Sequence, residues 1–437
     1  MADILTTRER DEARYMLLDG VAYSAEANGT VASLARGLAH LKVSRAPGKP
    51  FEKALGAILC DFLQAEAMAP GRWSYRSLMA NTFSGHDVGY RTFKRAVDGM
   101  KAHRMIEVAL GHQQWGQAFG EGPRVPMWRR ATRFRPTAWL KRYLGEAGIT
   151  PDNWEDHFQI VVPEGFSVAR PLVLRRKTMR VKSERFRGFG MALDPNDPKT
   201  KAQFDRVDRL NHWFASVGTS PVSFRGFQRT FNNGDQPGFD WNMGGRLYAV
   251  GGSYQTMKRA LRPTLTIDGE ETAEIDVKAS HPTILAALRG TPLGDAVDPY
   301  LVDGIPRDVA KACWTMTLGH QGLHRAWPNK VLEKLEPVYG KPLRHKFPVK
   351  VVQAKVVEAF PFLEGWGEDE LSSLHLQFVE SEAILLTVER LAYNLGVVGL
   401  PLHDSIIVKA KDAKVAEEVL REAYREVVGV VPTLERK

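Results

Sequence analysis

Cysteine is scarce in this sequence of 437 residues, and long apolar runs are missing altogether. The two cysteines, Cys60 and Cys313, have neither the spacing of a metal-binding motif nor enough partners for a disulfide framework, which is typical of a reducing compartment. No apolar run approaches the roughly 18 residues of a membrane-spanning helix, and the first residues, MADILTTRERDEARY, are charged. We therefore expect a cytoplasmic protein without a signal peptide or a membrane span.

Low-complexity tracts and internal repeats are also absent, and 43% of the residues are hydrophobic. Such a chain can bury a sizeable core, and its length favours two or three ordered domains. The excess of 60 Lys and Arg over 51 Asp and Glu gives a formal charge of +9, and the isoelectric point is about 9.4. This balance suits a polyanionic partner such as nucleic acid, although many basic proteins bind none.

The segment from about Pro50 to Pro136 is expected to form a compact unit. Apolar spacing predicts helices in FEKALGAILCDFLQAEAM, WSYRSLMANTF and VGYRTFKRAVDGMKAHR, and a glycine-rich loop and a return strand, RRATRFRPT, follow. Three helices and a hairpin resemble a winged helix-turn-helix, in which Arg91, Lys94 and Arg95 of the third helix would contact DNA. The alternative is a winged helix that contacts protein and carries a solvated basic face.

A second basic region, RPLVLRRKTMRVKSERFR, begins at Arg170 and holds eight basic residues and one acid. Interleaved apolar residues indicate that this region can pack on one side instead of forming a flexible tail. Its cations are therefore candidates for following a nucleic-acid backbone, chiefly Arg175, Arg176 and Lys177. The alternative is again a solvated basic face.

Two aspartates interrupt or end apolar strands. LPLHDSIIV sets Asp404 behind His403 between two short apolar segments, and TAEIDVKASHPTILAAL sets Asp276 at the end of a strand that precedes a helix. An ionised carboxylate buried without a partner is costly, so each aspartate is expected to face a cleft, where the pair can hold divalent cations. The alternatives are structural, with Asp276 as a helix N-cap and Asp404 as a turn former.

Between the two aspartates, GIPRDVAKACWTMTLGH predicts a helix with Pro306 at its first position. The four-residue spacing places Arg307 and Lys311 on one face of this helix. Two carboxylates and a cationic helix face suit a nucleoside triphosphate, with metal ions on the acids and phosphates on the cations.

These motifs, in this order, resemble those of the single-subunit polymerase superfamily, which joins family A DNA polymerases and phage-type RNA polymerases. The resemblance is carried by IDVKASHP, RDVAK and HDS, and by GGRLYAV around Arg246, and it covers roughly Trp241 to the last residue. It implies an α+β fold with a right-hand polymerase palm. The fingers are expected to be reduced, because only 31 residues separate Asp276 from Arg307.

The resemblance also implies roles for single residues. Asp276 and Asp404 would hold two Mg²⁺ ions, with Mn²⁺ able to substitute. Arg307 and Lys311 would contact the incoming triphosphate, Lys311 would protonate the leaving pyrophosphate, and Arg246 would contact nucleotide, template or primer. The chain departs from the family where the helix continues as CWTMTLGH, without the aromatic-glycine ending expected after the lysine, and where no exonuclease-like region precedes the palm.

The sequence gives two contrary indications about the sugar of the product. TMTL, FVES and HDS are more similar to the phage-type RNA polymerases. His281, five residues after the first aspartate, stands where the DNA polymerases place a bulky side chain that excludes a 2′-hydroxyl. A ring under the sugar acts directly on the discriminated atom, so we favour DNA. The alternative for His281 is a capping or packing role at the start of a helix.

We therefore predict a template-directed nucleotidyltransferase, a DNA polymerase of a phage, plasmid or other mobile element, which binds a DNA template, a primer and nucleoside triphosphates. An RNA polymerase or primase of the same superfamily is the first alternative, and a non-catalytic DNA-binding replication initiator is the second. The expected parts are an N-terminal arm (1–49), a winged-helix-like domain (50–150), a basic connector or thumb-like region (151–240) and a palm with fingers (241–437).

Overall fold

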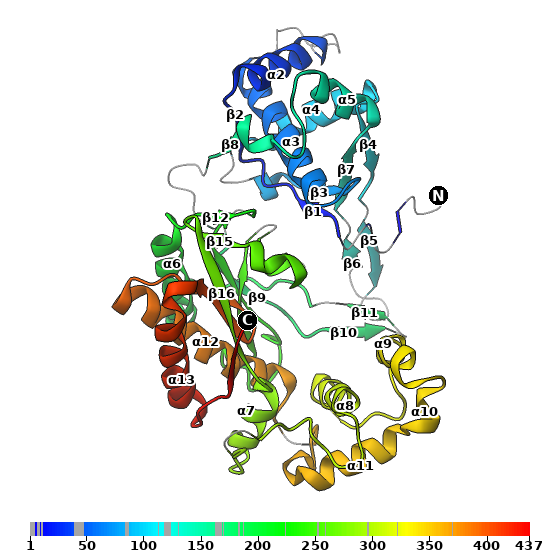
Figure 1. Cartoon of the computed structure of the whole chain (residues 1–437), viewed down its shortest axis with the longest axis vertical. Helices are drawn as coiled ribbons and strands as arrows, with labels where there is room; N and C mark the ends of the chain where they lie inside the picture. Colours follow the sequence, from blue (N-terminus) through cyan, green and yellow to red (C-terminus); the bar gives the residue numbers. More distant parts are fainter. Residues whose placement is uncertain are drawn as a thin grey trace. The chain divides into compact units, whose positions relative to one another are not determined.

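Helices and sheets are mixed along the chain in the computed structural model, which is consistent with the predicted α+β class (Figure 1). The structure describes all residues except 1–4, 7–8, 10–11, 39–47, 84–86, 112, 118–123, 130, 162–167, 169, 182–183, 187, 223, 251–252, 258, 295–296, 321 and 369. The chain forms two compact units. Unit 1 comprises Met1–Ala169, Val222–Gly226 and Ala249–Thr256, and unit 2 comprises Arg170–Pro221, Phe227–Tyr248 and Met257–Lys437.

Unit 1 packs helices against a small sheet. Its helices are α2 (Ala25–Leu38), α3 (Lys49–Met68), α4 (Tyr90–Ala102) and α5 (Ala138–Glu146). The sheet has the order β1-β3-β7-β4, with β1 (Arg14–Tyr15) parallel to β3 (Ser74–Arg76), and with β7 (Thr132–Pro136) antiparallel to both β3 and β4 (Ile106–Ala109). Two further pairs are β2 (Gly20–Ala22) with β8 (Phe158–Ile160), and the hairpin of β5 (Gln113–Gln117) and β6 (Arg124–Arg129).

Helix α4 shows how the sequence sets the packing of unit 1. Phe93, Ala96, Val97 and Met100 recur at helical spacing and are buried, because they lie on one face of the helix. The opposite face is polar and exposed. The basic residues predicted to contact DNA therefore lie outside the buried face of α4.

One predicted helix of unit 1 is wrong. WSYRSLMANTF is not a helix: Ser74 and Arg76 are buried on either side of the half-buried Tyr75, an alternation that suits strand β3, and a short 3-10 turn at Ala80–Phe83 follows. Among the described residues before position 50, Leu18 and Val31 share one hydrophobic core with α3 and α4. The expected connector at 151–240 is also divided between the two units, with most of it in unit 2.

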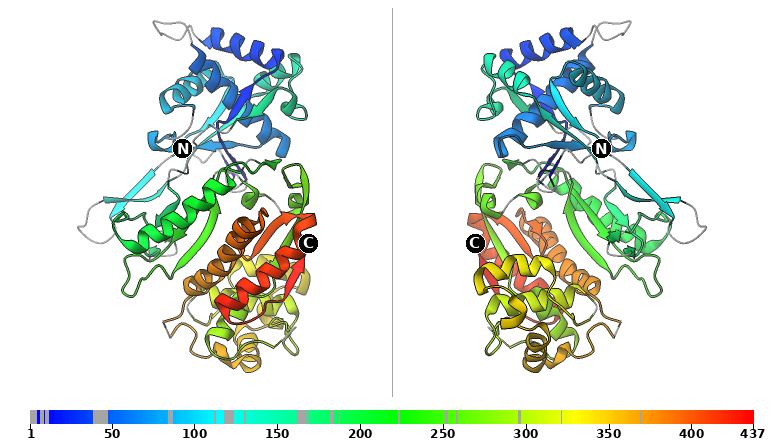
Figure 2. Two further views of the ribbon diagram at one scale, coloured as in Figure 1. Left: turned by 90° about the vertical axis from the view of Figure 1, so that its left-hand side faces the viewer. Right: turned by 90° about the vertical axis from the view of Figure 1, so that its right-hand side faces the viewer.

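Unit 2 is built on an antiparallel sheet of six strands in the order β12-β15-β16-β18-β17, with β19 paired to β16. Its helices α12 and α13 lie side by side and contact the strands, and α7 contacts both helices (Figure 2). The strands are β12 (Thr219–Ser220), β15 (Thr266–Ile267), β16 (Glu270–Val277), β17 (Leu400–Leu402), β18 (Ser405–Lys409) and β19 (Leu434–Arg436), and the helices are α7 (Ser280–Leu288), α12 (Ser373–Leu395) and α13 (Ala413–Val428).

A second sheet of unit 2, in the order β14-β13-β9, joins β9 (Leu172–Leu174), β13 (Phe227–Phe231) and β14 (Gly244–Ala249). Leu172 and Leu174 pack with Phe231 and Trp241, so the start of the basic region after Arg170 is packed on one side, as predicted for the region. The remaining elements are α6 (Pro198–Phe214), the hairpin of β10 (Met179–Val181) and β11 (Glu184–Phe186), and the helices α8 (Arg307–Gly319), α9 (Asn329–Tyr339), α10 (Leu343–Lys346) and α11 (Val349–Ala359).

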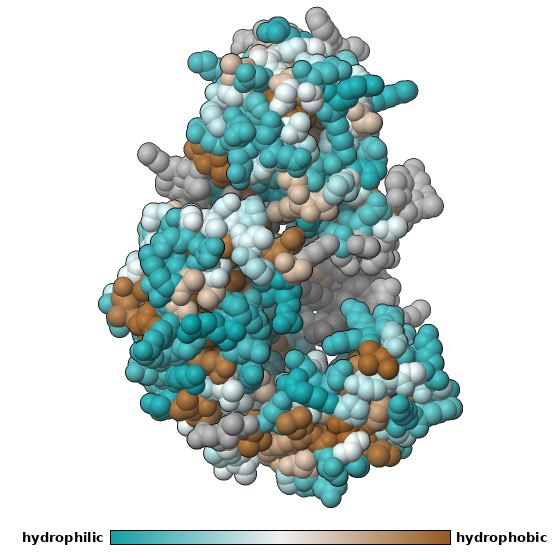
Figure 3. Space-filling model, in the orientation of Figure 1, coloured by the Kyte–Doolittle hydropathy of each residue, from teal (hydrophilic) through white to brown (hydrophobic). Residues whose placement is uncertain are grey.

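Within the described residues, no helix combines the length and apolar character needed to cross a membrane. On the face drawn in Figure 3, apolar residues are scattered among hydrophilic ones. Such scattered apolar residues are ordinary at a protein surface.

Candidate active site

Strand β16 presents Asp276 on its open face. Ala273, Ile275 and Val277 are buried on one side of the strand, and the period of two turns Glu274 and Asp276 to the other side. Asp276 pairs in register with Ser405 of β18, and the Val277 amide donates to the Asp404 carbonyl at 3.0 Å. The two aspartates predicted to act together therefore come from β16 and from the turn that precedes its neighbour β18.

Asp404 lies in a tight turn between two buried strands. β17 ends at Leu402 and β18 begins at Ser405, so His403 and Asp404 form the whole connection, and His403 adopts a left-handed backbone (φ 59°). Burial raises the pKa of Asp404 to about 6, and the nearby charges of Glu380 and Asp276 add to this rise. A carboxylate in this setting favours a cation beside it.

Glu380 of α12 is a third acid at this place and is almost completely buried. Burial by itself would raise its pKa, but His281, Arg246 and two hydrogen bonds hold the pKa below its usual value. Arg246 Nε donates to Oε1 at 2.9 Å and Ser280 Oγ donates to Oε2 at 2.8 Å. Nε2 of His281 lies 3.3 Å from Oε2, and burial lowers the pKa of this imidazole. Glu380 thus gathers Arg246 and His281 beside Asp404.

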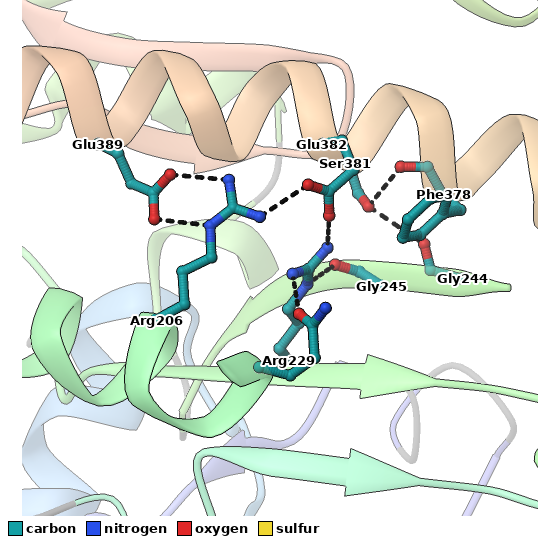
Figure 4. A network of polar contacts seen from close by, with 9 residues as sticks. Arg206, Arg229, Gly244, Gly245, Phe378, Ser381, Glu382 and Glu389 are labelled. Atoms are coloured by element: carbon teal, nitrogen blue, oxygen red, sulfur yellow. Dashed lines mark hydrogen bonds and ion pairs between the residues drawn. The ribbon is translucent and has the colours of Figure 1, made fainter. Parts of the chain in front are cut away.

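An ion-pair network fixes α12 against α6, β13 and β14 (Figure 4). Arg206 of α6 donates to Glu382 and Glu389 at 2.7 Å each, and buried Arg229 of β13 pairs with Glu382 and donates to the Gly245 carbonyl at 2.7 Å. Gly245 has a φ of 74°, and a Cβ there would lie about 3.0 Å from Ser381 Oγ, so the close approach requires glycine. The network holds β14, which carries Arg246, beside the helix that carries Glu380.

Helix α8 carries the predicted phosphate-binding cations in its first two turns. It begins at Arg307, one residue after Pro306, close to the prediction. Arg307 Nε donates to Asp298 Oδ2 at 2.7 Å, and about half of its side chain is exposed. The guanidinium of Arg307 and the ammonium of Lys311 lie 5.2 and 5.4 Å from the centre of the Tyr300 ring. The helix face therefore presents both cations around one aromatic ring, and the charges of Asp404 and Asp276 also act on Tyr300.

The predicted DNA-binding cations of unit 1 lie on α4. Arg91 is exposed, Lys94 pairs with Asp98 at 2.5 Å, and the Arg95 guanidinium lies 4.8 Å from the centre of the Phe51 ring. With Tyr90 and Gly99 they line a surface groove of about 380 Å³. Two of the three cations thus already have a partner, and Arg91 is exposed on the rim.

The predicted cations of the basic region lie in unit 2. Arg176 and Lys177 are exposed, whereas Arg175 is partly buried and its Nη1 donates to the Gly188 carbonyl at 3.5 Å. The Arg176 amide donates to the Phe189 carbonyl at 2.9 Å, and the Lys177 amide donates to Asp235 Oδ1 at 2.8 Å. The loop is ordered, so exposed Arg176 and Lys177 are presented from a fixed backbone.

The aspartate pair fits a hard divalent cation. Oxygen donors are the ligands that Mg²⁺ prefers, and the charge of Asp276 helps to raise the pKa of Asp404, as expected for two acids that share a cation site. A cation of the chain already stands at Asp276, because Lys437 Nζ lies 2.7 Å from Oδ2. The described residues contain no group of three or more His, Cys, Asp or Glu arranged to hold a metal.

Three residues of this site were missed or underrated from the sequence. Glu380 is not among the site residues predicted above; it is buried and accepts a hydrogen bond from Arg246. Tyr300 and Lys437 were not singled out. A tyrosine shortly before a cationic helix, in DPYLVDGIPRDVAK, was the only available signal, and nothing local marks Lys437.

Neither a protein-family model nor a curated protein matches this chain. Among solved structures, the chain is similar to the POL domain of Pol1 from M. smegmatis, in complex with a DNA primer-template and dNTP. The TM-score is 0.31 with 14% sequence identity, and the match covers 60% of this chain and 57% of that chain, less than two thirds of its length. A TM-score of this size does not establish a common fold, so the site's own geometry has to support any function.

Proposed function

We propose that this chain is a template-directed nucleotidyltransferase that extends a DNA primer. The observation that carries this proposal is that one compact unit contains the aspartates of β16 and the β17–β18 turn, and that both act on Tyr300, whose ring is flanked by the two cations of α8. Acids for metal ions next to cations for phosphates are what transfer of a nucleotidyl group from a triphosphate requires.

Each residue of the site has a role in this reaction. Asp276 and Asp404 would hold two Mg²⁺ ions, with Mn²⁺ able to substitute, and the bound ions would supply charge neutralisation and a more acidic primer 3′-hydroxyl. Arg307 and Lys311 would bind phosphate oxygens of the nucleoside triphosphate. Lys311 would also donate a proton to the leaving pyrophosphate. His281 would lie under the sugar.

The surroundings of the site support a DNA-bound protein. Sheet strands with helices α12 and α13 would form the palm, and α8 with the short helices α9, α10 and α11 would form reduced fingers. The helices and hairpin of unit 1 would act as a winged-helix DNA-binding domain, with Arg91 and its neighbours on α4 at the phosphates. Arg176 and Lys177 offer a second contact for the backbone of a nucleic acid. Arg246 is held by Glu380 and would contact nucleotide or primer through its exposed part.

A primer-extension assay tests this proposal. The full chain is incubated with a labelled primer on a longer template, with dNTPs or rNTPs, with Mg²⁺ or with EDTA, and with or without the primer. We expect Mg²⁺-dependent extension by dNTPs that requires the primer. Extension by rNTPs, or synthesis without a primer, assigns the RNA polymerase or primase alternative. Duplex binding without any incorporation assigns the non-catalytic initiator.

The Asp276→Asn variant is the control for contaminating polymerases. It is purified in parallel and has one carboxylate replaced by an amide of the same shape. Activity that survives unchanged in this variant does not belong to the site and contradicts the proposal.

A further inference from the structure

Tyr300 occupies the segment that leads into α8, and this segment is firmly anchored. Trp314 Nε1 of α8 donates to the Pro299 carbonyl at 2.7 Å, and the Tyr300 amide donates to Asp298 Oδ1 at 2.9 Å. The side chain is only 9% exposed. A tyrosine held this way keeps its ring in one place, so groups that contact the ring are held as well.

Both cations of α8 lie on this ring. The spacing of four residues brings Arg307 and Lys311 to the same side of the helix, and their charged groups lie 5.2 and 5.4 Å from the ring centre, within the range of cation–π attraction. Long basic side chains otherwise lose considerable rotamer freedom when they bind an anion. A ring that already orders them removes part of that cost.

The ring also differs from a carboxylate as a partner. Asp298 pairs with Arg307 Nε at 2.7 Å, and a phosphate that binds the Nε edge of the guanidinium has to displace it. The face of a neutral ring attracts the cations without neutralising them, so the phosphate can bind while the ring contact remains. Arg307 and Lys311 are thus kept in place and still available.

Negative charge of the acids also acts on Tyr300. Burial raises the pKa of its hydroxyl to about 12, and the charges of Asp298, Asp404 and Asp276 act in the same direction. The ring thus experiences the negative charge of the aspartates and the positive charge of Arg307 and Lys311.

We propose that Tyr300 is a positioning residue for the triphosphate, whose ring holds Arg307 and Lys311 ready for phosphate oxygens. The inference rests on the proposed function for the identity of the ligand as a nucleoside triphosphate. The ring contacts themselves do not depend on that function. They predict that binding of any linear triphosphate depends on the π face at position 300 and not on the hydroxyl.

Inorganic triphosphate is the probe, because it carries the charges that α8 would bind and has no base or sugar. Its dissociation constant is measured by calorimetry for the wild type, Tyr300→Phe and Tyr300→Leu. We expect the phenylalanine variant to bind within about twofold of the wild type and the leucine variant to bind about tenfold more weakly. Equal affinity of the leucine variant, or equal weakening in both variants, overturns the inference.

Fluorinated phenylalanines placed at position 300 keep the test valid if the leucine variant does not fold. Added fluorines leave the shape of the ring nearly unchanged and withdraw the negative charge of its face, which weakens cation–π attraction. We expect affinity for triphosphate to fall stepwise with fluorination. Affinity that is independent of fluorination overturns the inference.

Primer extension by the same proteins separates the two proposals. In an active enzyme, loss of the ring should raise the KM for dNTP about tenfold and leave kcat nearly unchanged, since the ring acts on binding. A wild type that extends no primer but binds triphosphate in a ring-dependent way contradicts the polymerase function and retains the role of Tyr300. An active enzyme whose KM for dNTP does not respond to Tyr300→Leu retains the polymerase function and contradicts the role of Tyr300.

Discussion

The ammonium of Lys437 lies 2.7 Å from Oδ2 of Asp276, one of the two aspartates proposed to hold metal ions. Lys437 reaches this position because β19 pairs with β16, and its amide donates to the Glu274 carbonyl at 2.9 Å. The same ammonium lies 3.7 Å from Glu274 Oε1. A divalent cation and this ammonium therefore compete for the same carboxylate oxygen.

Replacing Lys437 with Met should strengthen Mg²⁺ binding. The lost ion pair is partly exposed and contributes about 0.2–1 kcal/mol, which corresponds to an affinity gain of roughly up to fivefold. Calorimetric titration with Mg²⁺ at low salt measures this gain in affinity. Lys278→Met is the matched control, because Lys278 faces Glu435 at 3.8 Å on the exposed side and does not contact Asp276. Equal Mg²⁺ affinities for the wild type and Lys437→Met would contradict the competition.

Asp276→Asn and Asp404→Asn should each abolish Mg²⁺-dependent incorporation and leave duplex binding intact. The loss falls on the rate, because a metal ligand stabilises charge that develops only in the transition state. Single-turnover extension and duplex binding are measured on the same preparations. Asp152→Asn, in an exposed position of unit 1, is the control and should keep full activity. Near-normal turnover in either aspartate variant rules out the two-metal assignment.

Local patterns in the sequence predicted the elements that carry the proposed site. The alternation of β16, the turn at His403 and Asp404, and the helix that begins at Arg307 are all present, because each depends on neighbours within a few residues. The helix expected in WSYRSLMANTF failed for the opposite reason. Arg76 is buried in a strand where it donates to the carbonyls of Met16 and Thr82, and one of these partners is 60 residues away.

Local patterns in the sequence also could not predict which residues contact one another inside the site. Glu380 is 134 residues from Arg246, and its burial depends on how α12 packs against β14. Lys437 reaches Asp276 only through the pairing of β19 with β16. The proposed role of Tyr300 depends on two cations in the next helix and on the aspartates of β16 and the β17–β18 turn. Such long-range placements follow from packing and sheet order, which residue spacing does not encode.

Stability should depend on pH through Asp404. Its pKa is raised from 3.8 to about 6, so the folded state binds the proton more tightly than the unfolded state does. The free energy of unfolding therefore falls as pH rises from about 4 through 6, and the full penalty is present above this range. Without metal, Asp404→Asn should be more stable than the wild type at pH 7 by about 1–3 kcal/mol and nearly equal to it at pH 4. Urea unfolding of both proteins from pH 4 to 7 measures this difference, and parallel curves contradict the raised pKa.

Alanine at Arg91, Lys94 and Arg95 together should weaken duplex binding and flatten its dependence on salt. Fewer cations release fewer counterions from DNA, so the slope of log affinity against log salt should fall by up to about 3. Binding is measured by fluorescence anisotropy between low and physiological salt. The control is Arg36→Ala with Arg142→Ala, which removes exposed charge from other helices of unit 1. An unchanged slope in the triple variant favours the protein-contact alternative for this unit.

In our proposal, His281 determines whether the enzyme selects dNTPs or rNTPs. The imidazole lies 3.3 Å from the buried carboxylate of Glu380, and its proposed role is to exclude a 2′-hydroxyl by its bulk. The wild type should therefore prefer dNTPs, and His281→Gly should admit rNTPs by roughly 10- to 200-fold, the scale of one pocket contact. The ratio of kcat/KM for dNTP and rNTP is measured in both proteins. Ser280→Ala removes a hydrogen bond to the same carboxylate without changing the ring, so it controls for disturbance of Glu380 and should leave the ratio unchanged. A wild type that already favours rNTPs contradicts the steric role of His281 and assigns the chain to RNA synthesis.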